Sequence, residues 1–290
     1  MKDSSFSRIL IATDGSEAAA AAVSLAGSFA HASGAAVRIV HVWNLEVHHR
    51  AGVWDVETRS EARRLVDSSI SLVRRLGISA DGEILHADHG RVAVAIAEAA
   101  RNFEANLIVI GSRGLSDWQS ILTDHSVSHE LLTRVDCPVL VVRGPSPATE
   151  HASKRVLLAI AGGDDIEPAM AAAIAAAASP GSSVLVLHVA QAIFGAQGFA
   201  WVESGEEINQ VMARSTELLS KAGITASATV APHGPVAETV LAAAARWEAD
   251  VIVIGSSRMG DLGSLVLGSV THNLLRASAR PILVAEKARP

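Results

Sequence analysis

The chain has 290 residues, with 24 Lys and Arg against 30 Asp and Glu, which gives a net charge of -6. Hydrophobic residues make up 49% of the sequence and charged residues 19%, which is typical of globular domains and excludes a disordered chain. The acidic balance argues against nucleic acid as a main partner, because nucleic-acid-binding proteins usually present a clustered basic face.

We expect neither a membrane-spanning segment nor an export signal in this sequence. Its most apolar run, AMAAAIAAAA at 169–178, is shorter than the roughly 20 residues that span a bilayer, so we expect a buried helix there. The first residues, MKDSSFSRILIATDGS, lack the pattern of a signal peptide. We therefore expect a cytoplasmic protein that has neither membrane nor nucleic acid as a partner.

Two halves of the chain repeat each other. RILIATDGSE from Arg8 aligns with RVLLAIAGGD from Arg155 at an offset of 147 residues, and VHVW aligns with LHVA at the same offset. Further on, NLIVIGSRG aligns with DVIVIGSSR at an offset of 144 residues, so that Gly111 pairs with Gly255. A nearly constant offset indicates duplication of one fold. The Pro- and Ser-rich stretch 143–154 separates the copies, and we expect domains at residues 1–145 and 146–290.

In chain order, the first half shows apolar, β-rich runs at 8–12, 36–42, 79–86, 106–110 and 138–142, with helical periodicity between them. Strands that alternate with helices predict a parallel sheet. The wholly apolar LIVI and VIVI segments fit central strands that are covered on both faces. Gly77 and Gly223 each follow an amphipathic segment and are expected to end a helix. The predicted fold is α/β, with two tandem doubly wound domains, each a five-stranded parallel sheet flanked by helices.

Ligands of such sheets bind at the carboxyl ends of the strands, so the residues that follow the first and fourth strands are candidates. Asp14 and Ser16 follow the first strand in TDGSE, where ordinary turn chemistry is the alternative to a binding role. Gly111 and Gly114 follow the fourth strand, and a helix is expected to start near residues 125–126. Glycines allow close approach of the backbone to a phosphate, and a helix N-terminus offers free N–H groups to it.

At these motifs the sequence resembles the universal stress protein family in its tandem, two-domain form. The resemblance covers ILIATDGSE, VHVW, ANLIVIGSRG, SVSHELL and CPVLVV in the first half, and ADVIVIGSSRMGDLGSLVLGSV and PILVA in the second. It implies a Rossmann-like, adenine nucleotide alpha hydrolase-like fold. Nucleotide-binding members carry G-x2-G-x9-G-[ST] after the fourth strand and an Asp at the end of the first. The implied ligand is ATP, AMP or ADP, with Mg as an open question.

Each half keeps a different part of that pattern. The first half has Asp14 and the first two glycines, but it places His125 at the final glycine after ten residues rather than nine. The second half has the last Gly-Ser pair, but Arg258 replaces the middle glycine and Ala161 stands opposite Asp14. The residues that the resemblance implies are Ala12, Thr13, Asp14, Val42, Gly111, Arg113, Gly114, His125, Ser126 and Val127 in the first half and Val189, Gly255, Arg258, Gly268, Ser269 and Val270 in the second.

His125 and Arg258 each allow two readings. Either side chain crowds a place where backbone approaches phosphate, which predicts a degraded site. Either is also a cationic donor suited to phosphate, which predicts an altered but working site. His125 and His129 have the spacing of metal ligands on one helix face, but the sequence offers no evident third ligand, so we predict no metal site.

These features predict a stress protein that responds to an adenine nucleotide and has no catalytic residues, or at most hydrolyses ATP weakly. Two alternatives remain open: a scaffold that binds no nucleotide, and a slow ATPase in which Asp14 or Asp117 helps to hold a metal ion. The final strands of the halves, in CPVLVV and RPILVA, lie at a sheet edge in the family. We expect them to pair as an intrachain pseudo-dimer, and two chains to form a homodimer.

Overall fold

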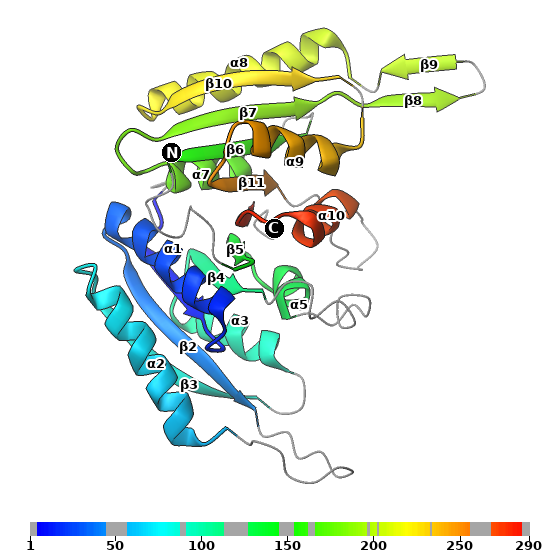
Figure 1. Cartoon of the computed structure of the whole chain (residues 1–290). Coiled ribbons are helices and arrows are strands. Elements are labelled where there is room, and N and C mark those ends of the chain that lie inside the picture. The colour runs from blue at the N-terminus through cyan, green and yellow to red at the C-terminus, as the bar shows by residue number, and fades with distance from the viewer. Residues whose placement is uncertain are drawn as a thin grey trace. The chain divides into compact units, whose positions relative to one another are not determined.

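A computed structural model describes residues 5–44, 57–87, 91–112, 127–144, 154–161, 166–195, 198–201, 203–232, 234–255 and 268–285 (Figure 1). The chain divides into two compact units. One runs from Phe6 to His151, and the other comprises Ala152–Pro290 together with the first five residues. We refer to them as the first and the second unit, in the order of their sheets along the chain.

The described part of the first unit contains five strands in one parallel sheet. They are β1 (Arg8–Ala12), β2 (Ala36–Asn44), β3 (Ala80–Ala87), β4 (Leu107–Gly111) and β5 (Val139–Val142). The strand order is β3-β2-β1-β4-β5, and each neighbouring pair is parallel. All five strands predicted from the sequence are confirmed, with ends that agree within two residues.

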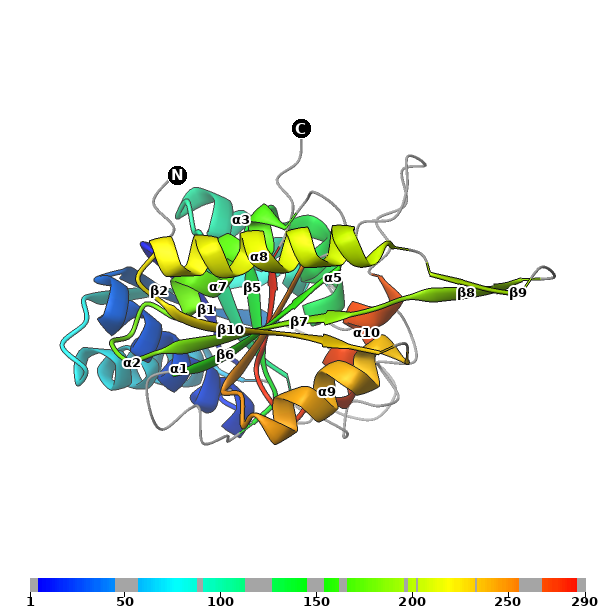
Figure 2. The same cartoon turned by 90° about the horizontal axis from the view of Figure 1, so that it is seen from above.

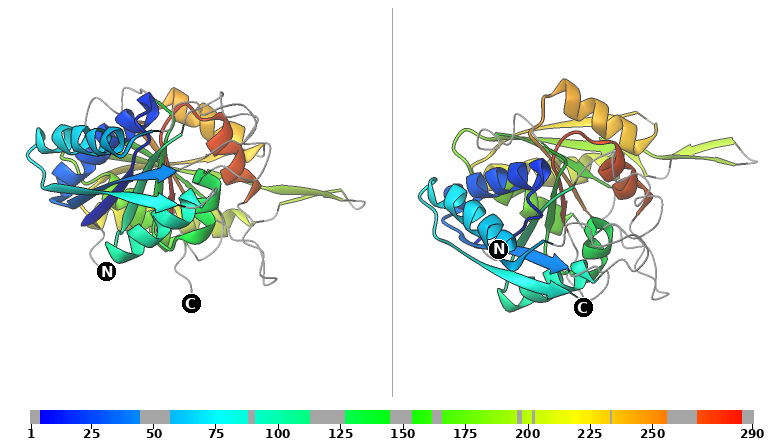
Figure 3. Two further views of the ribbon diagram at one scale, coloured as in Figure 1. Left: turned by 90° about the horizontal axis from the view of Figure 1, so that it is seen from below. Right: turned by 60° about the horizontal axis from the view of Figure 1, so that its bottom comes forward.

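Helices cover both faces of this sheet. They are α1 (Glu17–Ser33), α2 (Arg59–Arg74), α3 (Val92–Asn102) and α5 (Val127–Arg134). The first two pack on each other, and so do the last two (Figure 3). Because the chain reverses its direction across the sheet after β3, right-handed crossovers place these two pairs on opposite faces. The β4 residues from Leu107 to Val109 are completely buried, which confirms a central strand.

The second unit repeats this architecture. Its parallel strands are β6 (Arg155–Ile160), β7 (Ser183–Val189), β10 (Thr225–Ala231), β11 (Val251–Gly255) and β12 (Ile282–Ala285), in the order β10-β7-β6-β11-β12. Its helices are α7 (Glu167–Ala176), α8 (Gly205–Lys221), α9 (Val236–Arg246) and α10 (Ser269–Ala277). Position for position, the strand order is that of the first unit. The predicted pair of doubly wound, five-stranded domains is therefore confirmed.

Two local expectations also hold. The alanine-rich segment forms the buried helix α7, whose small side chains pack closely against β6 and β11. Gly77 and Gly223 follow α2 and α8 with φ angles of 79° and 75°, the left-handed conformation that commonly ends a helix.

Among its described residues, the second unit also contains a hairpin. Strands β8 (Ala192–Gly195) and β9 (Gly198–Trp201) pair antiparallel between β7 and α8. Figure 2 shows the hairpin extending outward from the end of β7. It lies in the crossover that joins the second strand of this unit to its second helix.

Matching capping boxes begin the second helix of each unit. At α2, the Thr58 N–H donates to Glu61 Oε2 at 2.7 Å, and the Glu61 N–H donates to Thr58 Oγ1 at 3.2 Å. Ser204 and Glu207 make the same two bonds at the start of α8, at 2.7 and 3.2 Å. The hydrogen bonds from Thr58 lower the pKa of Glu61. These caps fix the residue at which each helix starts.

We expect Thr58→Ala to lower the free energy of unfolding by about 1 kcal/mol at pH 7, because an orphan N–H of α2 loses its acceptor. The lowered pKa of Glu61 means that its contribution is present above the pKa of the unfolded state and is lost as pH falls through the folded pKa. The difference between variant and wild type should therefore shrink in acid. Urea unfolding at pH 7 and below pH 4 measures both, with Thr58→Asp as the control that keeps an acceptor. An equal cost for Ala and Asp would contradict the capping role.

Candidate functional site

The candidate site lies at the carboxyl edge of each sheet, where the strand order reverses. In the first unit β1 has β2 on one side and β4 on the other, and Ala12 is in register with both Val40 and Ile110. In the second unit Ala159 is in register with Leu187 and Ile254. Such switch points form the ligand crevice of doubly wound sheets.

Asp14 lies at this edge in a tight turn between β1 and α1. Its side chain is exposed, and its Oδ1 accepts the Ser16 N–H at 3.0 Å. Gly15 has a φ of 76°, and a side chain there would lie 2.6 Å from Leu65 Cδ1 on α2. The Ser16 hydroxyl oxygen accepts the Ala19 N–H at 3.2 Å and caps α1. The turn chemistry considered from the sequence is therefore present, and it holds the carboxylate at the switch point.

The other predicted residues of the first unit that the structure describes share this edge. Thr13 is buried, and Val42 lies half-buried on the part of β2 that runs past the end of β1. Gly111 ends β4, and Val127 begins α5 with 38% of its surface exposed. Arg113, Gly114, His125 and Ser126 lie outside the described residues, so the predictions made for them remain predictions.

In the second unit the edge is less polar after its first strand. Ala161 follows β6 and is exposed, and Val189 at the end of β7 is buried. Gly268 caps α10 with φ and ψ of -58° and 145°, which leaves the N–H groups of Ser269 and Val270 at the start of the helix. Such an end suits an anion. Arg258 lies outside the described residues.

Gly111 has a reason for being glycine that the motif did not suggest. A Cβ at this position would lie 2.5 Å from the Ala19 nitrogen and 2.7 Å from the Ala18 carbonyl carbon, both in the backbone of α1. The end of β4 and the first turn of α1 thus approach too closely for any side chain. At Gly255 the nearest atom to a Cβ is Ala169 Cβ, at an ordinary 3.8 Å. The two aligned glycines therefore have different packing requirements.

A buried histidine bridge, which the motif analysis missed, lies beside Asp14. His41 on β2 is 7% exposed, and its Nδ1 lies 2.8 Å from the Thr13 carbonyl oxygen. Its Nε2 lies 2.7 Å from Glu57 Oε2, just before the capping residue of α2. The Trp43 indole donates to the Glu57 carbonyl oxygen at 2.8 Å.

The second unit contains the same bridge. His188 is 2% exposed, with Nδ1 3.2 Å from the Ile160 carbonyl oxygen and Nε2 2.8 Å from Glu203 Oε2. The sequence signal was the alignment of VHVW with LHVA, which repeats a histidine on a strand that is otherwise apolar. The acceptors could not be found from that alignment, because each Glu comes from a segment 15 or 16 residues further along the chain.

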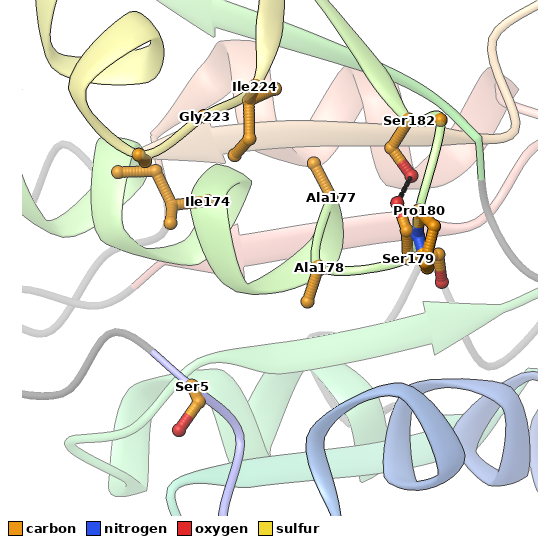
Figure 4. A pocket seen from close by; sticks show the side chains of 11 residues that line it. Ser5, Ile174, Ala177, Ala178, Ser179, Pro180, Ser182, Gly223 and Ile224 are labelled. Atoms are coloured by element: carbon orange, nitrogen blue, oxygen red, sulfur yellow. Dashed lines mark hydrogen bonds between the residues drawn. The ribbon is translucent and has the colours of Figure 1, made fainter.

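A pocket of about 370 Å³ lies elsewhere in the second unit. Its lining includes the end of α7 and the turn that precedes β10, with Ala177, Ala178 and Ile224 among its residues (Figure 4). The Ser182 hydroxyl donates to the Ser179 carbonyl oxygen at 2.7 Å, so its polar lining is partly satisfied internally. This pocket is at the amino end of the strands and is separate from the candidate site.

Two doubly wound repeats, each with a candidate site at the strand-order reversal, define a tandem protein of the doubly wound α/β class. The sequence matches the Universal stress protein family over residues 5–143 and again over 152–286. The chain belongs to this family, with two copies of its domain. The predicted membership is thus confirmed.

Two relatives align with this chain over nearly the whole length of both proteins. Universal stress protein Rv2623 of Mycobacterium tuberculosis is 25% identical over 97% of this chain and 96% of its own. Universal stress protein Rv2005c of the same organism is also 25% identical, over 97% of both chains. A crystal structure of a universal stress protein from Archaeoglobus fulgidus covers 99% of both chains with a TM-score of 0.72 at 21% identity, which supports the fold. In the part of the chain that the structure describes, no helix is long and apolar enough to cross a membrane.

We expect Gly111→Ala to destabilise the first unit by about 1 to 3 kcal/mol, because the added methyl group overlaps the α1 backbone. Gly255→Ala, its aligned counterpart, should change the free energy of unfolding by less than about 0.5 kcal/mol. Chemical denaturation of both variants and the wild type measures the two changes in the free energy of unfolding. Equal effects would mean that the approach of α1 to β4 does not constrain position 111.

Proposed function

We propose that the chain binds ATP or a related adenine nucleotide at the carboxyl edge of its sheets and acts as a nucleotide-responsive regulatory protein. The observation that carries this proposal is the exposed Asp14 carboxylate at the switch point between β1 and β4 in a universal stress protein. A carboxylate at this edge suits the hydroxyl groups of a ribose, since such charge-assisted hydrogen bonds are the stronger ones.

The two units are proposed to differ in what they bind best. The first has Asp14 and is the better adenosine site, whereas Ala161 offers no acceptor side chain at the same place in the second. The second has Gly268 at the start of α10 and is proposed as the better phosphate site, because no capping side chain occupies the first N–H groups of the helix. The roles of His125 and Arg258 as blocking residues or phosphate donors remain predictions.

Two further statements belong to the proposal. We propose that the chain forms a homodimer with an internal pseudo-dimer of its domains, divided near residues 145 and 146, and that it is cytoplasmic. Nucleic acid and membranes are not among the proposed partners. Light scattering over micromolar concentrations tests the dimer, and a monomeric mass throughout would exclude it.

The alternatives are a scaffold without nucleotide and a slow ATPase. Nucleotide that copurifies with the protein, identified by mass spectrometry after denaturation, separates these possibilities. A stoichiometric adenine nucleotide excludes the scaffold, and steady release of phosphate from added ATP favours the enzyme. Without any bound nucleotide, and without ATP binding by calorimetry, the scaffold remains.

Asp14→Ala should weaken ATP binding by about 1.5 to 3 kcal/mol, or roughly 10- to 150-fold, through loss of a charge-assisted hydrogen bond. Asp14→Asn keeps an acceptor for the Ser16 N–H, so it preserves the turn and removes only the charge. Both variants should bind ATP less tightly in calorimetry, and Ala161→Asp in the second unit should bind more tightly. Wild-type affinity in Asp14→Ala would exclude Asp14 from the site.

His125→Gly combined with deletion of Thr123 restores the nine-residue spacing of the family motif. If His125 crowds the phosphates, this variant should bind ATP more tightly while its affinity for adenosine stays the same, since only the phosphates meet that backbone. Calorimetry with both ligands measures the difference. Weaker ATP binding in the variant would instead identify the imidazole as a phosphate ligand.

A further inference from the structure

We propose that His41 and His188 are positioning residues, each of which fixes the end of the first strand and the start of the second helix of its unit. In the first unit, the bridge of His41 with Glu57 sets the backbone that presents Asp14 to the nucleotide. The nucleotide part of this inference rests on the proposed function. The bridge itself rests on geometry alone.

The hydrogen positions follow from the partners of the imidazole ring. A carbonyl oxygen only accepts hydrogen bonds, so the His41 Nδ1 that lies 2.8 Å from the Thr13 oxygen must donate. At 2.7 Å, the contact between His41 Nε2 and Glu57 Oε2 is attractive only with a hydrogen between the two atoms. The pair therefore holds one more proton than a neutral imidazole beside a carboxylate.

The two units differ in how far the strand ladder runs. The β1–β2 register ends at the pair Ala12 and Val40, one residue before Thr13. In the second unit the register continues to Ile160 and His188, and the contact from the imidazole to the carbonyl oxygen is longer, at 3.2 Å. The Thr13 carbonyl is thus held by the His41 side chain just beyond the last ladder pair. The Thr13 N–H donates to the Val40 carbonyl oxygen at 2.9 Å, so β2 holds the peptide before Thr13 and His41 holds the carbonyl group after it.

The other end of the bridge fixes α2. Glu57 is held through its carboxylate by His41 and through its carbonyl oxygen by Trp43, and the capping residue of α2 follows it directly. Leu65 on α2 then packs against Gly15, the residue after Asp14. Asp14 therefore lies between two positions that are both linked to His41: Thr13, which His41 contacts directly, and Gly15, which contacts α2.

Because His41 and Glu57 are largely buried, we expect these contacts to be sensitive to loss of either side chain. The side chains of His41 and Glu57 are 8% and 33% exposed, and those of His188 and Glu203 are 3% and 17% exposed. Removing the carboxylate leaves Nε2 without its partner in a mostly buried place. A glutamine at 57 can instead donate its amide hydrogen to a neutral ring, whose Nδ1 still donates to Thr13. Glu57→Gln thus keeps the bridge while removing the extra proton.

The test uses ATP as the probe and four variants of the full chain. Glu57→Ala should weaken ATP binding about 5- to 10-fold in calorimetry, the value of one hydrogen bond that orders the site. Glu57→Gln should stay within about 2-fold of the wild type. Glu203→Ala is the matched control, because it breaks the bridge of the unit that lacks Asp14 and should leave the first site unchanged. Glu57→Asp, shorter by one methylene group, serves if the Ala variant does not fold.

Nitrogen-15 chemical shifts of the imidazoles give a second readout that needs no nucleotide. In the wild type, His41 and His188 should each show a hydrogen at both ring nitrogens or shared with the carboxylate. In Glu57→Gln, the His41 Nε2 should shift to the value of a pure acceptor, and His188 should not change.

Three results would overturn the proposal. The first is a folded Glu57→Ala or Glu57→Asp variant that binds ATP as tightly as the wild type. The second is an equal effect of Glu203→Ala on the binding event that Asp14→Ala weakens, which would mean that the bridge acts only on general stability. The third is a wild-type His41 whose Nε2 shift is that of an unprotonated acceptor. If the wild type binds no nucleotide, the proposed function and the role of His41 in positioning Asp14 are both wrong. The imidazole shifts would still show whether His41 and Glu57 share a hydrogen bond.

Discussion

The parallel hydrogen-bond ladder between two apolar strands, β1 and β4 in the first unit and β6 and β11 in the second, determines the rest of each fold. The central residues of these strands are buried and apolar, and the polar residues within them are Arg8 and Arg155 at the starts of β1 and β6. Polar side chains that could bind a ligand therefore follow the last paired residues of these strands. Because all strands of the sheet point the same way, they stop at the same edge. The turn with Asp14, the end of β4 and the start of α5 are brought together by that single constraint.

The sequence was sufficient for the fold because its signals are local. Apolar runs of four or five residues and glycines after helices follow from short-range physics, and the nearly constant offset applies each assignment to both copies. The strands of the first unit agree with their predicted positions for this reason, and so does α7. Asp14 and Gly111 could be placed at the carboxyl edge from topology alone.

The contacts that shape the candidate site are not local, and they escaped the sequence analysis. Gly111 was interpreted as a position for a phosphate, yet its backbone lies against the first turn of α1, a segment more than 90 residues earlier in the chain. His41 looked like one histidine on an apolar strand, and only the folded structure supplies the oxygens of Thr13 and Glu57. Side-chain pairing of this kind depends on the register between strands and on where a helix begins, and neither is encoded in a short motif.

The bridges also bear on how the crossover from the second strand to the second helix can change during evolution. His41 and Glu57 are 16 positions apart and His188 and Glu203 are 15 apart, so the two copies already differ in length between fixed anchors. Lengthening a loop whose ends are held costs little conformational entropy. In the second unit the interval between His188 and Glu203 contains the β8–β9 hairpin, and the sheet has the same strand order as in the first unit. The two copies therefore share the anchored ends of this crossover and the strand order of the sheet, while the number of residues between the anchors differs by one.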